Sequence, residues 1–209
     1  MLGFHLTNES LERTRLAFDS SCPATCPMLV DRPYYERSGG GVTFSGGEPM
    51  LHLDFLDRVL DLCGREAVHT NLETAGTFSF ERWKSVLRKF DLIYFDLKIL
   101  DRELHRRHLG GGYDTIADNA RILVEEGFPV EFRLPLVPGY TDTEANIERV
   151  VERLGRLGKR TVHLLSYHNM GETKIDIIAG KQPKLGLDRS WPMDRFQQSS
   201  KLPSSITHS

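Results

Sequence analysis

Short runs of β-branched and aromatic residues alternate with longer amphipathic segments along the middle of the chain. The runs with the composition of strands are residues 41–45, 67–72, 92–95, 130–134 and 161–165. Apolar residues at helical spacing predict helices over residues 55–63, 80–87, 116–124 and 147–157. This alternation is typical of βα units on a parallel sheet, so we expect an α/β fold.

Two of the predicted helices carry signals at their ends. Thr141 is followed three residues later by Glu144, which predicts a capping box before the last helix. Gly127 lies where a residue of left-handed conformation would end the preceding helix.

The two ends of the chain do not continue this alternation. Residues 1–30 contain one candidate helix, over 6–18, but no strand leading into it, so we expect the first βα unit to be missing. Residues 188–209 are rich in Gln, Ser and Pro and have little to bury, which predicts a mostly disordered tail. The expected domain, with about five βα units, therefore covers residues 31–187.

Composition narrows the class of protein. The 209 residues suit one domain, and the mean hydropathy of −0.35 comes without any run of the roughly 18 apolar residues that a membrane span requires. A net charge of −2 lacks the basic excess that favours nucleic acid. Three cysteines and no export signal at the start indicate a reducing compartment. We expect a soluble cytoplasmic protein without nucleic-acid or membrane partners.

The residues with distinctive chemistry follow the predicted strands, at the edge where parallel α/β folds bind ligands. The five strand ends run into Ser45-Gly46-Gly47-Glu48-Pro49, Glu73-Thr74-Ala75-Gly76, Asp96-Leu97-Lys98, residues 133–139, and Ser166-Tyr167-His168-Asn169-Met170-Gly171. Each group also has a simpler explanation that stays open. These are a tight turn at Gly46-Gly47, surface ion pairs of Asp96 with Lys98 and of Glu131 with Arg133, and a hydrogen-bonded loop position for His168.

Taken together, the strand ends favour one ligand site with both signs of charge. Glu48, Glu73 and Asp96 could meet an ammonium or a sulfonium, while Lys98 and Arg133 could meet a carboxylate. The sequence contains no P-loop. An amino acid-like zwitterion therefore fits better than a nucleotide polyphosphate.

These motifs closely resemble those of the glycyl-radical enzyme activating enzymes, the pyruvate formate-lyase activating family of radical S-adenosylmethionine (SAM) proteins. The segments that carry the resemblance are residues 38–49, 73–76, 91–98, 137–142 and 167–171. The resemblance implies a partial (β/α) barrel of the radical SAM type and oxidoreductase chemistry. In this family a 4Fe-4S cluster binds and cleaves SAM, and the resulting 5′-deoxyadenosyl radical removes hydrogen from a glycine of a large partner enzyme.

The resemblance also implies a set of cofactor-binding residues: Gly46, Gly47, Glu48, Glu73, Asp96, Lys98, Arg133 and His168. Gly47 and its neighbours would receive the methionyl ammonium, and Lys98 the carboxylate. Arg133 and His168 would hold the nucleoside.

The cysteines depart from the family pattern. Family members carry Cys-x3-Cys-x2-Cys, but here Leu29 follows Cys22 and Cys26 at the third position. These two cysteines resemble the end of a ferredoxin-type run, which makes residues 1–30 a possible remnant of a ferredoxin-like insert with two metal ligands; two free thiols are the alternative. Cys63 lies on the apolar side of a predicted helix, which indicates packing.

Three hypotheses of function follow. The first is a glycyl-radical enzyme activating protein that uses SAM and a 4Fe-4S cluster. The second is an inactive, N-terminally truncated SAM-binding remnant without a cluster, which the cysteine count favours. The third is a Schiff-base lyase on a β/α barrel, with Lys98 as the nucleophile.

Overall fold

The computed structural model describes residues 2–5, 31–45, 48–167 and 207–208. The chain divides into two compact units. Unit 1 comprises Met1–Asp96 and Gly112–Glu131, and unit 2 comprises Leu97–Gly111 and Phe132–Ser209.

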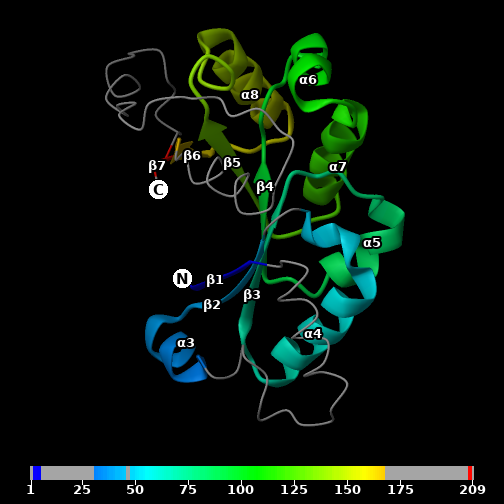
Figure 1. Cartoon of the computed structure of the whole chain (residues 1–209), viewed down its shortest axis with the longest axis vertical. Helices are drawn as coiled ribbons and strands as arrows, with labels where there is room; N and C mark the ends of the chain where they lie inside the picture. Colours follow the sequence, from blue (N-terminus) through cyan, green and yellow to red (C-terminus); the bar gives the residue numbers. More distant parts are fainter. Residues whose placement is uncertain (1, 6–30, 46–47, 168–206, 209) are drawn as a thin grey trace, which may run out of the picture. The chain divides into compact units, whose positions relative to one another are not determined.

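A parallel sheet forms the centre of unit 1. Its strands are neighbours in chain order: β1 (Leu2–His5), β2 (Gly41–Ser45), β3 (His69–Thr74) and β4 (Leu92–Asp96). The helices of unit 1 are α3 (Arg32–Ser38), α4 (Leu53–Arg65), α5 (Phe80–Leu87) and α7 (Tyr113–Glu125), with a 3₁₀ turn η2 (Pro49–Leu51). Figure 1 shows α4, α5 and α7 on the same side of these strands.

The core of unit 1 lies between the sheet and these helices. Phe44, Leu72 and Phe95 alternate with polar neighbours along β2, β3 and β4, and each is fully buried. Leu56 of α4 and Leu123 of α7 are buried as well. Because each large apolar side chain contributes roughly 1.5–3 kcal/mol when buried, this layer fixes which face of the sheet the helices cover.

Unit 2 contains most of β5 (Val130–Leu136), which pairs in parallel with β6 (His163–Ser166), and β6 pairs with β7 (Thr207–His208). Its helices in the described ranges are α6 (Arg102–Leu109) and α8 (Glu144–Arg156). Across the part of the chain that the structure describes, no helix has both the length and the apolar character needed to cross a membrane.

The structure adds a short strand near each end of the chain. Leu2–His5 form β1, parallel to β2, where no strand was expected. Leu2–His5 include a glycine and no β-branched residue, so they lack the composition by which the other strands were predicted. Thr207 and His208, in the tail expected to be mostly disordered, form β7. The candidate helix over 6–18 and the rest of the tail lie outside the described residues.

The second predicted strand begins later than expected. Residues 67–72 were predicted, whereas β3 is His69–Thr74. The amide of Val68 still donates to the carbonyl of Cys63, and Ala67 has a φ of +52°, so the chain is turning out of α4 at these residues. Cys63 is buried in α4, which confirms the packing interpretation.

The capping box predicted for α8 was also wrong, although the helix itself is confirmed. Thr143 is the N-cap residue, and its hydroxyl accepts a hydrogen bond from the Asn146 amide. Thr141 is buried instead, where its hydroxyl accepts from the Val137 amide at 2.6 Å and donates to the Pro135 carbonyl. At the end of α7, Gly127 adopts the predicted left-handed conformation with a φ of +70°.

Replacing Glu126 by glutamine is expected to reduce the amount of stability that the protein loses as the pH is lowered. Lys84 donates to the Glu126 carboxylate at 2.8 Å and Arg88 at 3.1 Å. The hydrogen bond from Lys84 holds the pKa of Glu126 below its ordinary value of 4.5, and the charges of Lys84 and Arg88 act in the same direction. The stabilisation is therefore present above the ordinary pKa and is lost as the pH falls. The test is to measure urea unfolding midpoints at neutral pH and at pH values below the ordinary pKa of Glu126, with Glu152→Gln as the exposed control. If acid lowers the midpoints of Glu126→Gln and wild type equally, the prediction is contradicted.

Candidate functional site

One face of the unit 1 sheet is polar. Along β2, β3 and β4, every second side chain faces the helices, and the side chains between them point away from the helices. The residues on this second face are Thr43, Ser45, Asn71, Glu73, Tyr94 and Asp96. The parallel register places Thr43 beside Asn71 and Glu73 beside Tyr94. Two of the sequence-predicted carboxylates, those of Glu73 and Asp96, therefore lie at the carboxyl ends of neighbouring strands on the face that helices α4, α5 and α7 do not cover.

Thr43 contributes a buried hydroxyl to this face. The residue is only 4% exposed, and among the residues that the structure describes its Oγ1 has no hydrogen-bond partner. Burying a hydroxyl without a partner costs about 1–3 kcal/mol. A polar ligand on this face of β2 would offset that cost.

Glu48 links the loop after β2 to the end of β3. Its carboxylate accepts hydrogen bonds from the Thr74 hydroxyl at 2.8 and 3.0 Å and from the Ala75 amide at 3.2 Å. It also accepts from the Met50 amide at 3.4 Å. The structure thus gives this carboxylate a clear role in joining two strand ends, and a direct contact with a cofactor stays a prediction.

The turn after β3 depends on a glycine. Gly76 has a φ of +79°, and a Cβ atom added there would lie 2.2 Å from Cζ of Phe95. Its amide donates to the Thr74 hydroxyl at 3.0 Å. Thr74 thereby connects Glu48 to Gly76 through one side chain.

Asn119 of α7 holds the same turn from the helix layer, a role that the sequence interpretation missed. Its side-chain amide donates to the carbonyls of Gly76 at 2.9 Å and Phe78 at 2.8 Å, and the residue is buried. An amide on the apolar face of a helix is the signal that could have found it, because buried polar groups are almost always hydrogen-bonded.

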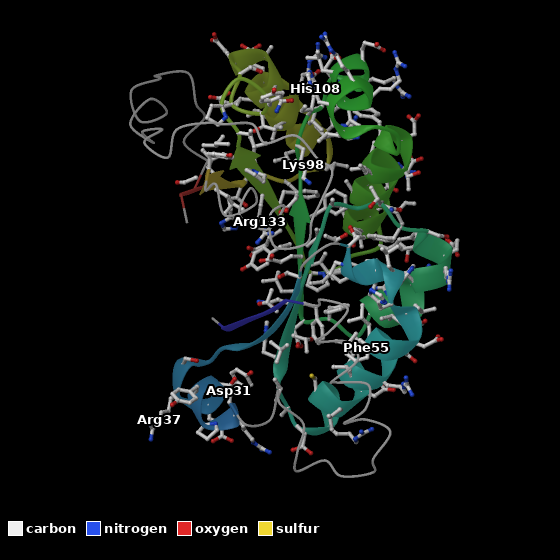
Figure 2. The ribbon with its side chains drawn as sticks, in the orientation of Figure 1. Asp31, Arg37, Phe55, Lys98, His108 and Arg133 are labelled. Atoms are coloured by element: carbon white, nitrogen blue, oxygen red, sulfur yellow. The ribbon has the colours of Figure 1, made fainter. Side chains whose placement is uncertain are left out.

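Lys98 and Arg133, the two positively charged residues predicted for the site, both belong to unit 2. Figure 2 shows Lys98 on the segment after β4 and Arg133 on β5. The Leu97 amide donates to the Arg133 carbonyl at 2.8 Å, so the backbones that carry the two side chains are adjacent. Both residues are half-buried, and Arg133 pairs in register with His163 of β6.

The remaining predicted site residues, Gly46, Gly47, His168, Cys22 and Cys26, lie outside the described residues. Within residues 31–45 and 48–167, no group of three or more His, Cys, Asp or Glu side chains could hold a metal ion.

Comparison with known proteins identifies the class. A model of the radical SAM superfamily matches residues 29–154. The chain is 38% identical to a trans-4-hydroxy-L-proline dehydratase activating enzyme of Clostridioides difficile, over 72% of this chain and 51% of that protein. It is 34% identical to a pyruvate formate-lyase-activating enzyme of Clostridium pasteurianum, over 77% and 65% respectively.

A solved structure agrees with these relatives. A domain of a pyruvate-formate lyase-activating enzyme from Bacteroides vulgatus matches with 33% identity and a TM-score of 0.57, covering 68% of this chain and 94% of that one. The chain belongs to the radical SAM superfamily and, within it, to the glycyl-radical enzyme activating enzymes. The prediction of an α/β fold of the radical SAM partial-barrel type is thereby confirmed. The chain spans about half to two thirds of the curated relatives named above.

Proposed function

We propose that this chain binds SAM as part of a glycyl-radical enzyme activating enzyme. In such an enzyme, one electron from a 4Fe-4S cluster would break a sulfonium C–S bond of bound SAM, giving methionine and a 5′-deoxyadenosyl radical. That radical would take a hydrogen atom from a glycine of a large partner enzyme. Membership of the family supports this activity, and the polar face of the unit 1 sheet is the structural observation that carries the proposal.

The residues of each unit fit the chemistry of SAM. The methionyl end of SAM carries an ammonium, a sulfonium and a carboxylate. Glu73 and Asp96 of unit 1 suit the two cationic groups, and the buried hydroxyl of Thr43 suits a polar neighbour. Lys98 of unit 2 suits the carboxylate, and Arg133 the nucleoside.

The described residues do not supply a site for a 4Fe-4S cluster. Cys63 is buried in α4, and no suitable group of ligands occurs in the described ranges. Cys22 and Cys26 lie outside those ranges and do not complete the family motif in the printed sequence. We therefore assign to this chain only the binding and orientation of SAM.

A second candidate function is SAM binding without radical chemistry. The absence of Cys-x3-Cys-x2-Cys from the printed sequence favours it. The two candidates share the same binding residues and differ only in whether iron is recruited.

Equilibrium dialysis is expected to show that the purified chain binds SAM more tightly than S-adenosylhomocysteine. The reason is that S-adenosylhomocysteine lacks the sulfonium charge, which Glu73 and Asp96 would stabilise. Glu73→Gln should reduce this preference, whereas Glu152→Gln on the exposed side of α8 should not. A chain that binds neither compound would contradict both candidate functions.

Anaerobic reconstitution with iron and sulfide then separates the two candidates. A reduced 4Fe-4S signal in EPR spectra that changes on adding SAM would favour the activating enzyme. SAM binding without incorporated iron would favour the second candidate.

A further inference from the structure

The segment that carries Lys98 is held by side chains from elsewhere in unit 2. Residues 97–100 belong to neither a helix nor a strand. The Leu97 amide donates to the Arg133 carbonyl, and the Ile99 carbonyl contacts Nδ1 of the buried His105 at 3.1 Å. Side-chain and backbone partners therefore replace the regular hydrogen bonds of secondary structure along this segment.

The side chain of Asn146 makes further contacts with this segment. Its Oδ1 accepts a hydrogen bond from the Leu100 amide at 2.8 Å. Its Nδ2 donates to the Lys98 carbonyl at 2.8 Å and to the Thr141 carbonyl at 3.0 Å. Asn146 is 5% exposed, so these bonds form in a buried setting where an unmade bond is costly.

An asparagine suits this position better than its chemical relatives. A side-chain amide offers two donors and one acceptor oxygen, and all three groups are needed here. Aspartate would keep an acceptor for Leu100 but would bring a carboxylate against the carbonyls of Lys98 and Thr141. Alanine would leave all three backbone groups without this partner.

We infer that Asn146 is a positioning residue that fixes the backbone of Lys98 so that its ammonium meets the SAM carboxylate. This inference rests on the proposed function, in which Lys98 binds that carboxylate. Asn146 holds the chain at Lys98 itself and again two residues later, which restricts rotation on the carboxyl side of Lys98. The long lysine side chain thus starts from a fixed backbone.

A double-mutant cycle on SAM affinity tests whether Asn146 acts through Lys98. Lys98→Ala is expected to raise the dissociation constant about 10- to 100-fold, because a hydrogen bond between charged groups is lost. Asn146→Ala is expected to raise it about tenfold. The double variant should bind no more weakly than Lys98→Ala alone, since Asn146 has then nothing left to position. Effects that multiply, or wild-type affinity in Asn146→Ala, would overturn the inference.

Thr143→Ala is the matched control on the same helix. It removes the N-cap bond to the Asn146 amide and leaves the three side-chain bonds of Asn146 in place. We expect a lower melting temperature with unchanged SAM affinity. Hydrogen exchange at the Leu100 amide should accelerate in Asn146→Ala but not in Thr143→Ala, a readout that needs no SAM.

Asn146→Asp covers the case in which Asn146→Ala does not fold. It should keep the slow exchange at Leu100 and still lose SAM affinity, because only the donors to Lys98 and Thr141 are removed. Wild-type SAM affinity in this variant would overturn the inference. If the wild-type chain binds SAM and the Asn146 variants bind equally well, only the inference fails; if the wild-type chain does not bind SAM, the proposed function fails and the inference with it.

Discussion

Gly76→Ala is expected to destabilise the protein by about 3–5 kcal/mol. Two costs add. Gly76 has a φ of +79°, which strains any residue with a Cβ atom, and that atom would lie 2.2 Å from Cζ of Phe95. Phe95 is fully buried, so its ring has no free space into which to move. Urea unfolding of the purified variant measures the loss, and SAM binding should fall with it because the turn carries the end of β3.

Gly127→Ala separates these two costs. Gly127 has a similar φ of +70°, but an added Cβ would meet no atom within 4 Å. Its expected cost is only the backbone term of about 1–2 kcal/mol. Equal losses in the two variants would show that the Phe95 ring does not determine the effect at Gly76.

Glu48→Ala is expected to cost about 2–4 kcal/mol and to weaken SAM binding. The Thr74 hydroxyl, in a residue that is 2% exposed, and the Ala75 amide would both lose their acceptor. The loop after β2 would then no longer be joined to the end of β3. Urea unfolding and equilibrium dialysis measure the two effects.

Two further variants serve as controls for Glu48→Ala. Glu48→Gln keeps an acceptor oxygen and should lose less stability than Glu48→Ala. Glu152→Ala removes an exposed carboxylate paired with Arg156 at 2.6 Å and should change stability by less than about 0.5 kcal/mol. Equal stability of Glu48→Ala and wild type would contradict the linking role described for Glu48.

Apolar periodicity predicted the layers of this fold because burial of one helix face leaves a regular pattern in the sequence. The predicted helices over 55–63, 80–87, 116–124 and 147–157 correspond to α4, α5, α7 and α8. Helix α6 left no such pattern, since seven of its eight residues are exposed and four of them are Arg or Glu. The carboxylate of Asp101 caps its first turn by accepting from two backbone amides at 3.0 Å.

The site was predictable only in part. Strand ends could be located from the sequence, so the positions of Glu73, Asp96 and Lys98 at those ends followed. The partners of these segments could not be predicted, because Glu48 bonds Thr74 across 26 residues and Asn146 bonds Lys98 across 48. Local patterns contain no information about contacts at such separations. These long-range contacts form only when the helices pack on the sheet.

The two buried asparagines have a consequence for how such domains can be recombined. Asn119 of α7 holds the turn at Gly76, and Asn146 of α8 holds the segment at Lys98. Each loop is therefore held by a helix that comes later in the chain than the next strand. If two related genes are recombined at a point between a loop and its asparagine, the chimera takes the loop from one parent and the asparagine that holds it from the other. Because the spans 76–119 and 98–146 overlap, residues 76–146 form a single block that is best inherited whole.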